Sequence, residues 1–598
     1  MKQKLREEIS NEYKWDLEAI YKNKEEFEDE LKKIEQEIDK IDKYKDILME
    51  SSSNLLECLE LDTNISRRLS KAHTYANCYF DSDTGNASYQ EMLGKVNNLY
   101  QKYSEKISFI EPSILKCDYN TIQKYMEESP KLKSYERNLK EIYRFKKYIL
   151  SDNEEKIISN LEKALDSSST TYESLTDTDM TYGNIIDENG ESVELTDSNY
   201  NKYIKSNDRR VRKEAFDELY RVYSNFKNTI CSTIKGNIEA NTSIAKIRGY
   251  NSAIEASLFS DNIDVSVYNN LIDTVSNNLS SLFKYYDLKK KILGLDEMHL
   301  YDTYVSIINE KPREYTFDEA KELVKKALSV LGDKYINDLN NAFTEKWIDI
   351  YNNKGKRGGA YSGGSYDTYP YVLLNFEGTL NDVSTLAHEL GHSMHSYYSR
   401  LNNSYQDSNY KIFVAEVAST VNELLLSKYL LKNTSDKREK LIILNNLLDL
   451  FKATIFRQTM FAEFEKNIYE KHEKGEILTA ELLCNDYYEL NKKYFGNSVY
   501  VDDEIKYEWE RIPHFYYYFY VYKYATGLSA ACYIVNGILS GSKDALDNYL
   551  KFLTLGGSMD PLDELKVAGI DMTKPEAILS AIHMFDEILE EFEQLYNA

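Results

Sequence analysis

The rarity of proline is the feature that most constrains how this chain can fold. Only 7 of its 598 residues are proline. Proline removes a backbone donor and clashes inside a helix, so its rarity suits long uninterrupted helices. Leu31, Ile34, Ile38 and Ile41 agree with this, because they form one apolar stripe among Glu and Lys residues. The heptad pattern then lapses, and we predict a mainly α protein whose N-terminal part is a helical hairpin instead of a coiled-coil rod.

The length of the chain predicts more than one lobe. A single hydrophobic core stops growing at roughly 250–300 residues, so 598 residues suggest at least two lobes around a shared cleft. The Asn189-Gly190 pair lies between two strand-like segments and is typical of a hairpin turn. We place the boundary near this turn, with an N-terminal helical lobe at 1–198 and a second domain at 199–598.

The composition disfavours several classes of partner. A formal net charge of −25 argues against nucleic acid and anionic membranes, because both attract a basic surface. No stretch reaches the roughly 18 apolar residues of a membrane-spanning helix. Residues 1–23 are charged throughout, unlike a secretory signal, and the six cysteines lack paired spacing. We therefore predict a cytoplasmic protein with buried thiols, and the oligomeric state stays open.

The run His-Glu-Leu-Gly-His that starts at His388 places two imidazoles and a carboxylate on one turn of a helix. Residues four apart share a helical face, so His388 and His392 can converge on one tetrahedral cation. Glu389 then lies beside the metal and can take a proton from water. Thr379 and Asp382 have the spacing of a capping box that begins this helix. The pattern predicts a zinc hydrolase site.

A third ligand must come from further along the chain. The three-histidine pattern requires a glycine three residues and a histidine six residues after His392, where this chain has His395 and Tyr398. A glutamate on the following apolar helix is the remaining option. Glu416 and Glu423 are seven apart and share a face. Apolar residues flank Glu416, where a carboxylate needs a partner, and we favour Glu416 as the ligand.

Three segments resemble a known family. Residues 379–395, the Phe-Val-Ala-Glu-Val-Ala-Ser-Thr segment at 413–420 and the stretch 511–516 are similar to oligoendopeptidase F, of the thimet-oligopeptidase-like zinc peptidases. The resemblance implies one zinc ion held by His388, His392 and Glu416, with Glu389 as the catalytic base. It also implies a two-lobed helical body with the zinc deep in a channel, and cleavage of short peptides at internal bonds.

The same resemblance draws attention to His514 and the tyrosines after it. The family places a histidine and tyrosines here to stabilise the charged tetrahedral intermediate. Tyr517, Tyr520 and Tyr524 have the spacing to share one helical face with that role. We therefore predict that His514, Tyr517 and Tyr524 are catalytic and that Tyr520 contacts the substrate. A competing register uses three other tyrosines: Tyr516, Tyr518 and Tyr522.

A strand-like region precedes the metal helix. Residues 369–376 are rich in β-forming residues and follow a glycine-rich loop at 355–364. This loop lacks the Gly-Lys-Ser/Thr ending of a phosphate-binding loop. We predict a small sheet beside the zinc, in which residues from Tyr371 form an edge strand that pairs with substrate, while Gly363 and Gly364 let the loop close over it. A flexible connection is the alternative.

Together these patterns predict a zinc-dependent endopeptidase that hydrolyses short oligopeptides, with its catalytic domain at 199–598. One alternative is an exopeptidase that releases dipeptides, which would need a charged pocket to bind a substrate terminus. A second alternative is a peptide-binding protein without activity. The presence of Glu389 argues against it, because binding alone does not require a base.

Overall fold

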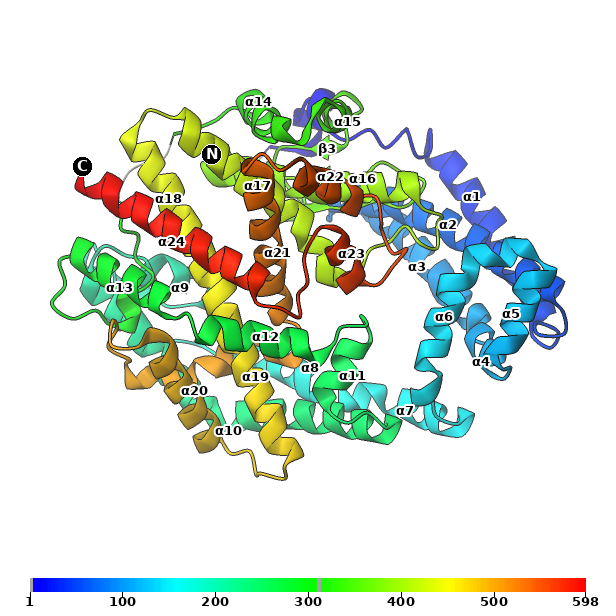
Figure 1. Cartoon of the computed structure of the whole chain (residues 1–598), viewed down its shortest axis with the longest axis horizontal. Helices are drawn as coiled ribbons and strands as arrows, with labels where there is room; N and C mark the ends of the chain where they lie inside the picture. The colour runs from blue at the N-terminus through cyan, green and yellow to red at the C-terminus, as the bar shows by residue number, and fades with distance from the viewer. Residues whose placement is uncertain (1–3, 309–312) are drawn as a thin grey trace. The chain divides into compact units, whose positions relative to one another are not determined.

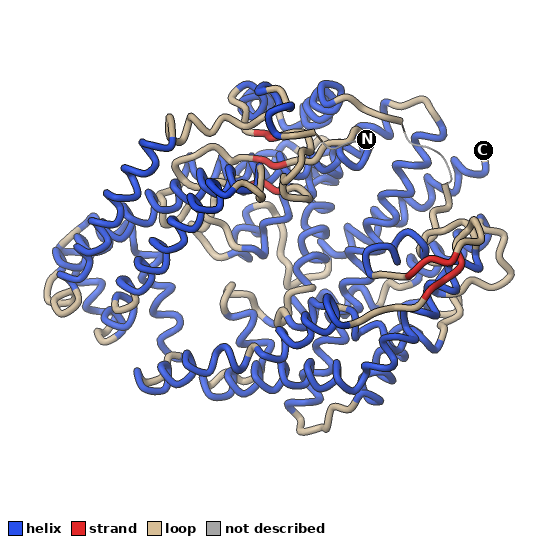
Figure 2. Tube along the Cα trace, turned by 180° about the vertical axis from the view of Figure 1, so that it is seen from behind, coloured by secondary structure: helices blue, strands red, loops and turns tan. Residues whose placement is uncertain are grey.

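The computed structural model of the chain describes residues 4–308 and 313–598. It is 71% helical and 2% strand, which confirms the predicted mainly α class. Figure 2 marks the few strands in red along a chain that is otherwise helices and loops. The chain forms two compact units that alternate along the sequence.

Unit 1 comprises Met1–Lys147, Pro312–Tyr429 and Ile534–Gly569. Its elements, labelled in Figure 1 where there is room, are α1 (Lys24–Ile38), α2 (Ser52–Ser82), α3 (Ala87–Ile107), α4 (Ile110–Leu115), α5 (Tyr119–Glu128), α6 (Glu136–Phe145), α14 (Phe317–Ala327), α15 (Asp333–Thr344), β3 (Ile348–Asp349), β4 (Tyr361–Ser362), β5 (Val372–Leu373), α16 (Leu380–Asn402), α17 (Ile412–Asn433, through residue 429), α22 (Lys543–Phe552) and α23 (Pro561–Val567).

Unit 2 comprises Tyr148–Lys311, Leu430–Tyr533 and Ile570–Ala598. Its elements are α7 (Asp152–Leu165), α8 (Ser167–Ser174), β1 (Asn184–Ile186), β2 (Ser192–Glu194), α9 (Asp197–Ile204), α10 (Arg209–Arg248), α11 (Ala253–Phe259), α12 (Val265–Ser276), α13 (Ser280–Ile292), α18 (Lys437–Phe451), α19 (Gln458–Glu473), α20 (Ala480–Phe495), α21 (Tyr522–Leu539, through residue 533) and α24 (Glu576–Asn597).

Neither unit is a continuous stretch of the chain. The chain passes between them after residues 147, 311, 429, 533 and 569, and none of these points is the predicted boundary at 198. The division into an N-terminal helical lobe at 1–198 and a catalytic domain at 199–598 stays a prediction. The Asn189-Gly190 hairpin does form, with β1 and β2 antiparallel and Gly190 at φ +84°. It lies inside unit 2, where β1 packs against α10.

The N-terminal region is helical as predicted. Asn23 begins α1 by accepting a hydrogen bond from the backbone N–H of Glu26. Ile34 and Ile38 are fully buried and Leu31 nearly so, in one core with residues of α2 and α3. Helices α2 and α3 pack against each other as a hairpin, because their apolar faces bury one another.

The small sheet of unit 1 corrects one prediction. Its strand order is β3-β5-β4, so β5 is the central strand. It pairs in parallel with β3, with Ile348 opposite Val372, and antiparallel with β4, with Tyr361 opposite Leu373. The predicted edge strand that starts at Tyr371 therefore has both sides occupied, and β4 is an edge strand of this sheet.

Tyr371 itself is a core residue. It is 0% exposed, its ring packs edge-on against Trp15, and its hydroxyl donates to the backbone oxygen of Asp16 at 2.6 Å. The structure contradicts the prediction that Tyr371 pairs its backbone with substrate, because its N–H donates to the backbone oxygen of Tyr369 and its C=O accepts from the N–H of Gly363. The sequence pattern correctly indicated a strand but could not show which strands would flank it.

A buried ion cluster anchors the sheet. Asp349 of β3 is fully buried and pairs with Arg6 and with Lys356, whose ammonium also donates to the backbone oxygen of Tyr351 at 2.8 Å. These two cations hold the pKa of Asp349 below its usual value, although burial opposes them. The N-terminal segment, β3 and the glycine-rich loop are thus tied together at one carboxylate.

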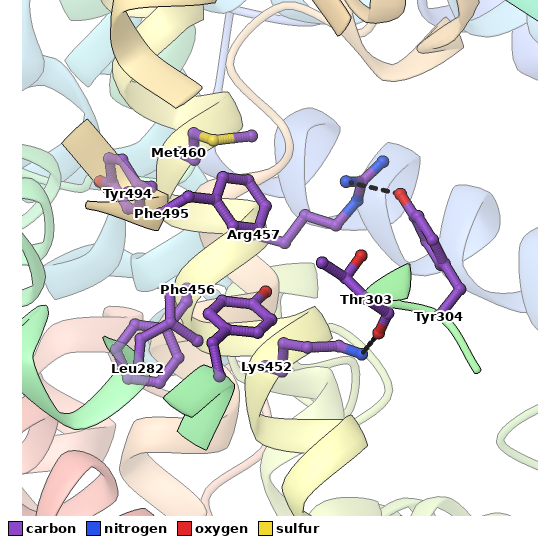
Figure 3. A pocket seen from close by; sticks show the side chains of 10 residues that line it. Leu282, Thr303, Tyr304, Lys452, Phe456, Arg457, Met460, Tyr494 and Phe495 are labelled. Carbon is purple, nitrogen blue, oxygen red and sulfur yellow. Dashed lines mark hydrogen bonds between the residues drawn. The ribbon is translucent and has the colours of Figure 1, made fainter. Parts of the chain in front are cut away.

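Unit 2 contains a cavity of about 40 Å³ with an apolar and a cationic side. Figure 3 shows Lys452 donating to the backbone oxygen of Thr303 and Arg457 close to the hydroxyl of Tyr304. None of the predicted site residues lines it. None of the helices in residues 4–308 and 313–598 combines the length and the apolar character needed to cross a bilayer.

We expect Asp349→Ala to lower the free energy of unfolding of unit 1 by about 3–5 kcal/mol, because it leaves the buried Lys356 and the half-buried Arg6 without their partner. Chemical denaturation would measure this loss. Asp367→Ala is the matched control, since Asp367 pairs with Arg67 at a site where both side chains are about one third exposed. That change should cost no more than about 1 kcal/mol. Equal losses in the two variants would contradict the anchoring role.

Candidate metal centre

Helix α16 begins where its capping box predicts. The Thr379 hydroxyl accepts a hydrogen bond from the N–H of Asp382 at 3.2 Å, and the Asp382 carboxylate accepts one from the N–H of Thr379 at 2.8 Å. Val383, Leu390 and Met394 are fully buried on the apolar face of the helix. Burial of this face fixes the rotation of α16 and therefore where its histidines point.

Three ligand atoms converge between α16 and α17. The Nε2 atoms of His388 and His392 are 3.2 Å apart, and Glu416 Oε2 lies 3.4 Å from the first and 3.6 Å from the second. All three atoms fall within 4.8 Å of one another. Two imidazoles and a carboxylate are a donor set that divalent metals bind. No other such group of three occurs in the part of the chain that the structure describes.

Glu389 is close to this group but not part of it. Its side chain lies on α16 between the two histidines in sequence and is only 6% exposed. Burial raises the pKa of its carboxyl above the usual value, although the two histidines oppose this. A carboxylate with a raised pKa beside a metal site is suited to accept a proton and return it.

Gly391 explains how α17 can approach so closely. A Cβ at this position would lie 2.5 Å from Ser419 Cα and 2.6 Å from the backbone oxygen of Ala418. The two helices therefore touch backbone to backbone, one turn from Glu416. Asn422 secures the contact, because its buried amide donates to the backbone oxygen of Ala387 at 3.0 Å. The metal-binding motif does not indicate this glycine, since the position before the second histidine is variable in it.

Glu423 has a role that the sequence analysis did not assign. Its carboxylate lies 2.6 Å from His388 Nδ1, and Ser384 donates to its other oxygen at 3.0 Å. A carboxylate on the outer nitrogen of a ligand histidine fixes the ring and raises its basicity. Although burial opposes it, Glu423 raises the pKa of His388 to about 9. The seven-residue spacing to Glu416 was the available signal, because it placed both carboxylates on one face.

The edge strand β4 rests on the metal helix. Ser362 of β4 and Ser393 of α16 are joined by a 2.8 Å hydrogen bond, and Ser393 also donates to the backbone oxygen of Glu389 at 2.9 Å. The predicted small sheet therefore lies beside the metal helix. After β4, Gly363 donates its N–H to the backbone oxygen of Tyr371. Gly364 has φ +115°, and a Cβ there would be 2.4 Å from a backbone oxygen, so only glycine fits.

His514 and its tyrosines form a cluster within unit 2. His514 belongs to a 3-10 turn (Pro513–Tyr516), and the ring centroids of Tyr517, Tyr520 and Tyr524 lie 5.4, 6.4 and 5.9 Å from its own. The Tyr524 hydroxyl is 3.4 Å from His514 Nε2. Burial lowers the pKa of His514, which favours the neutral ring.

The arrangement of these tyrosines differs from the predicted one. The tyrosines do not share one helical face, because α21 begins only at Tyr522 and the chain turns sharply before it. The tyrosines of the competing register contact other parts of unit 2. Tyr516 stacks on Tyr172 and bonds Thr233, and Tyr522 is 1% exposed against Tyr268. Tyr518 lies toward Tyr469 and Phe519.

Comparison with known proteins matches residues 202–584 to Peptidase family M3 and residues 113–182 to Oligopeptidase F. The chain belongs to peptidase family M3. Oligopeptidase PepF of Bacillus subtilis is 43% identical over 590 residues, which cover 99% of this chain and 88% of that protein.

Solved structures agree with this M3 assignment. The crystal structure of oligoendopeptidase-F from Enterococcus faecium is 37% identical with a TM-score of 0.74, covering 96% of this chain and 99% of that one. A crystal structure from Chlamydophila abortus is 36% identical with a TM-score of 0.93, covering 99% and 100%. Membership of the M3 family makes the chain a metalloendopeptidase of the oligopeptidase type, which confirms the predicted class of enzyme.

We expect Gly391→Ala to lower metal affinity at least about tenfold, because the new methyl group pushes α17 and Glu416 away from the histidines. Metal content after mild chelation would measure the loss. Gly94→Ala in α3 is the control, since nothing lies within 4 Å of a Cβ there. The control should retain its metal and gain up to about 1 kcal/mol of stability from helix propensity. Normal metal retention by Gly391→Ala would contradict the close-contact argument.

Proposed function

We propose that His388, His392 and Glu416 hold one zinc ion and that Glu389 is the general base for peptide hydrolysis. The observation that supports this best is the convergence of two imidazole nitrogens and one carboxylate oxygen within 4.8 Å. Two uncharged Nε2 atoms 3.2 Å apart repel each other unless a proton or a cation lies near both. His-His-Glu is a known donor set of catalytic zinc, and M3 membership implies a metal.

The residues of the chain then have distinct tasks. Zinc supplies Lewis-acid activation of water and of the scissile carbonyl when it is bound. Glu389 accepts the proton of the attacking water at its carboxylate and delivers it to the nitrogen of the departing amine. Its shielded position keeps the carboxylate poorly solvated, so the proton is held strongly enough to be carried. Glu423 holds His388 in the orientation that presents Nε2 to the metal.

His514 and Tyr524 are proposed as donors to the oxyanion, with Tyr517 beside them. This assignment rests on the family resemblance and on the cluster itself, in which a neutral imidazole and phenol hydroxyls are grouped. Neutral donors suit this role, because they stabilise developing negative charge without binding the uncharged substrate more tightly. Tyr520 is proposed to contact the substrate next to the reacting bond.

We propose β4 as the strand that pairs with the substrate backbone. Gly363 points its N–H toward β5, and alternate residues of an antiparallel strand face the same neighbour. Ser362 therefore turns its N–H and C=O toward the open edge of the sheet. A peptide added there as a further strand would be held by main-chain bonds, with loose side-chain selectivity. Gly363 and Gly364 are proposed to contribute to substrate binding through their backbone conformation, which lets the loop turn directly after β4.

The natural substrates are proposed to be short flexible peptides cut at internal bonds. The relatives named oligopeptidase and oligoendopeptidase support this choice. A cytoplasmic location, without nucleic acid or membrane as partner, is consistent with the charge of −25 and with buried free thiols such as Cys58, Cys78 and Cys484.

We expect Glu389→Gln to lower kcat about 10³-fold with little change in metal content, because the amide cannot accept a proton. The assay is a mixture of peptides of graded length, with products identified by mass spectrometry. Exposed Glu377, just before α16, supplies the control variant Glu377→Gln, which should act like the wild type. Activity of Glu389→Gln within tenfold of the wild type would refute the assigned base. Release of only terminal dipeptides by the wild type would favour the exopeptidase alternative.

The metal ligands can be tested by zinc titration against a competing chelator at pH 6–9. Because His388 has a raised pKa near 9, zinc must displace its proton, and apparent affinity should rise about tenfold per pH unit up to that value. Glu423→Gln removes the charge that raises this pKa, so affinity should level off nearer pH 7. Glu416→Ala should bind zinc weakly at every pH. Wild-type affinity in Glu416→Ala would show that the ligand is misassigned.

A further inference from the structure

The segment between His514 and α21 contains two strained residues in succession. Tyr518 and Phe519 have φ of +52° and +59°, in the left-handed region that residues other than glycine rarely adopt. The described part of the chain has only two other such residues, Asn262 and Lys346, and neither adjoins another. Successive strained residues with bulky side chains persist only where surrounding contacts hold them.

This turn is what gathers the rings around His514. Ten residues of continuous helix would separate His514 from Tyr524 by about 15 Å along the axis. The observed ring centroids are 5.9 Å apart, and Tyr517 and Tyr520 lie on either side of the turn. The chain therefore has to bend away from a helical path at Tyr518 and Phe519 for the cluster to exist.

One buried carboxylate holds the turn. Glu465 of α19 is fully buried, and its Oε1 accepts a hydrogen bond from the N–H of Phe519 at 2.7 Å. Ser257 of α11 donates to the backbone oxygen of Tyr518 at 2.7 Å. The ring of Phe519 is 1% exposed and packs against Tyr268 and Tyr469. Both polar atoms of the peptide group between Tyr518 and Phe519 are thus bonded to side chains of neighbouring helices.

Among the described residues, no charged group lies near enough to compensate Glu465. The titratable groups that face it are Tyr268 of α12, Tyr469 of α19 and Tyr518 of the turn, all neutral. Its second oxygen, Oε2, is buried without a hydrogen-bond partner. Burial raises the pKa of Glu465 to about 8, despite the bond from Phe519. A leucine would fill this space at lower cost, so the carboxylate needs a specific reason to be there.

We propose that Glu465 is a positioning residue for the His514 cluster, because its bond to Phe519 locks the turn that brings Tyr517, Tyr520 and Tyr524 against His514. The inference rests on the proposed function of that cluster in stabilising the oxyanion. Glu465 touches neither substrate nor the reacting atoms. It acts through backbone geometry, where a displacement of about 1 Å is enough to lower a rate 10²-fold.

The test compares zinc-loaded Glu465→Gln and Glu465→Leu in kcat, KM and metal content. Glutamine retains an oxygen that can accept the Phe519 N–H, so its kcat should stay within about threefold of the wild type. Leucine has no acceptor, and its kcat should fall at least tenfold with KM and zinc content within about twofold. Tyr518→Gly, which adopts φ +52° without strain, should restore part of the lost kcat in the Glu465→Leu background.

His514→Gln separates this inference from the function on which it rests. If His514→Gln leaves kcat unchanged, the proposed role of the cluster fails, whatever Glu465 does. If His514→Gln lowers kcat but Glu465→Leu does not, only the positioning role fails. We expect Glu465→Leu to cause little further loss in the His514→Gln background, since the cluster is already disabled. A fully additive loss would show a purely structural effect and overturn the proposal.

A variant that does not fold would still leave the proposal testable. Ser257→Ala removes the second bond to the turn from a different helix and leaves the Glu465 carboxylate in place. It should lower kcat in the same direction as Glu465→Leu, by a smaller factor, with KM unchanged. An unchanged kcat in Ser257→Ala, together with insoluble Glu465→Leu, would count against the turn as the element that positions the cluster.

Discussion

The backbone contact between α16 and α17 at Gly391 is the constraint on which the metal centre depends. A histidine pair on one helix supplies only two ligands, and the third must come from a chain that can approach within a few ångströms. The absence of a side chain at Gly391 permits that approach, and Asn422 holds it by bonding a backbone oxygen of α16. Glu416 reaches the histidines because the helices meet there, one turn away. The three candidate ligands therefore meet because of how the helices pack, as well as because of which side chains they carry.

Buried and half-buried carboxylates with different partners surround the candidate metal centre. Glu416 faces the two histidines, Glu423 holds the outer nitrogen of His388, and Glu389 lies beside them in a shielded position. Each has a different partner, and the partner decides what the group can do: a carboxylate facing nitrogen donors binds a cation, whereas a poorly solvated one carries a proton. Glu465 is a further example. Its partner is the backbone N–H of Phe519, and through this bond it acts on the geometry of the turn.

Much of the site could be predicted from local pattern. The spacing of His388 and His392 placed them on one face, and the capping box located the start of their helix, because both depend only on neighbours along the chain. The apolar flanks singled out Glu416. The predictions went wrong where distant segments decide the outcome. Tyr371 looked like a residue of an edge strand, but β3 and β4 occupy both sides of β5. The tyrosines after His514 were expected to share one helical face, but the chain bends sharply among them before α21 begins.

The sequence by itself determined the helical class, the metal-binding motif, the Asn189-Gly190 hairpin and the general position of the small sheet. All of these follow from periodicity and short spacing, which one segment of chain contains completely. Only the tertiary structure decided that Glu423 orients His388, that Gly391 lets two helices touch, that β4 is an edge strand, and that Tyr517, Tyr520 and Tyr524 face His514. Some of these features depend on contacts between residues far apart in sequence. Others depend on backbone angles that non-glycine residues adopt only where surrounding contacts hold them.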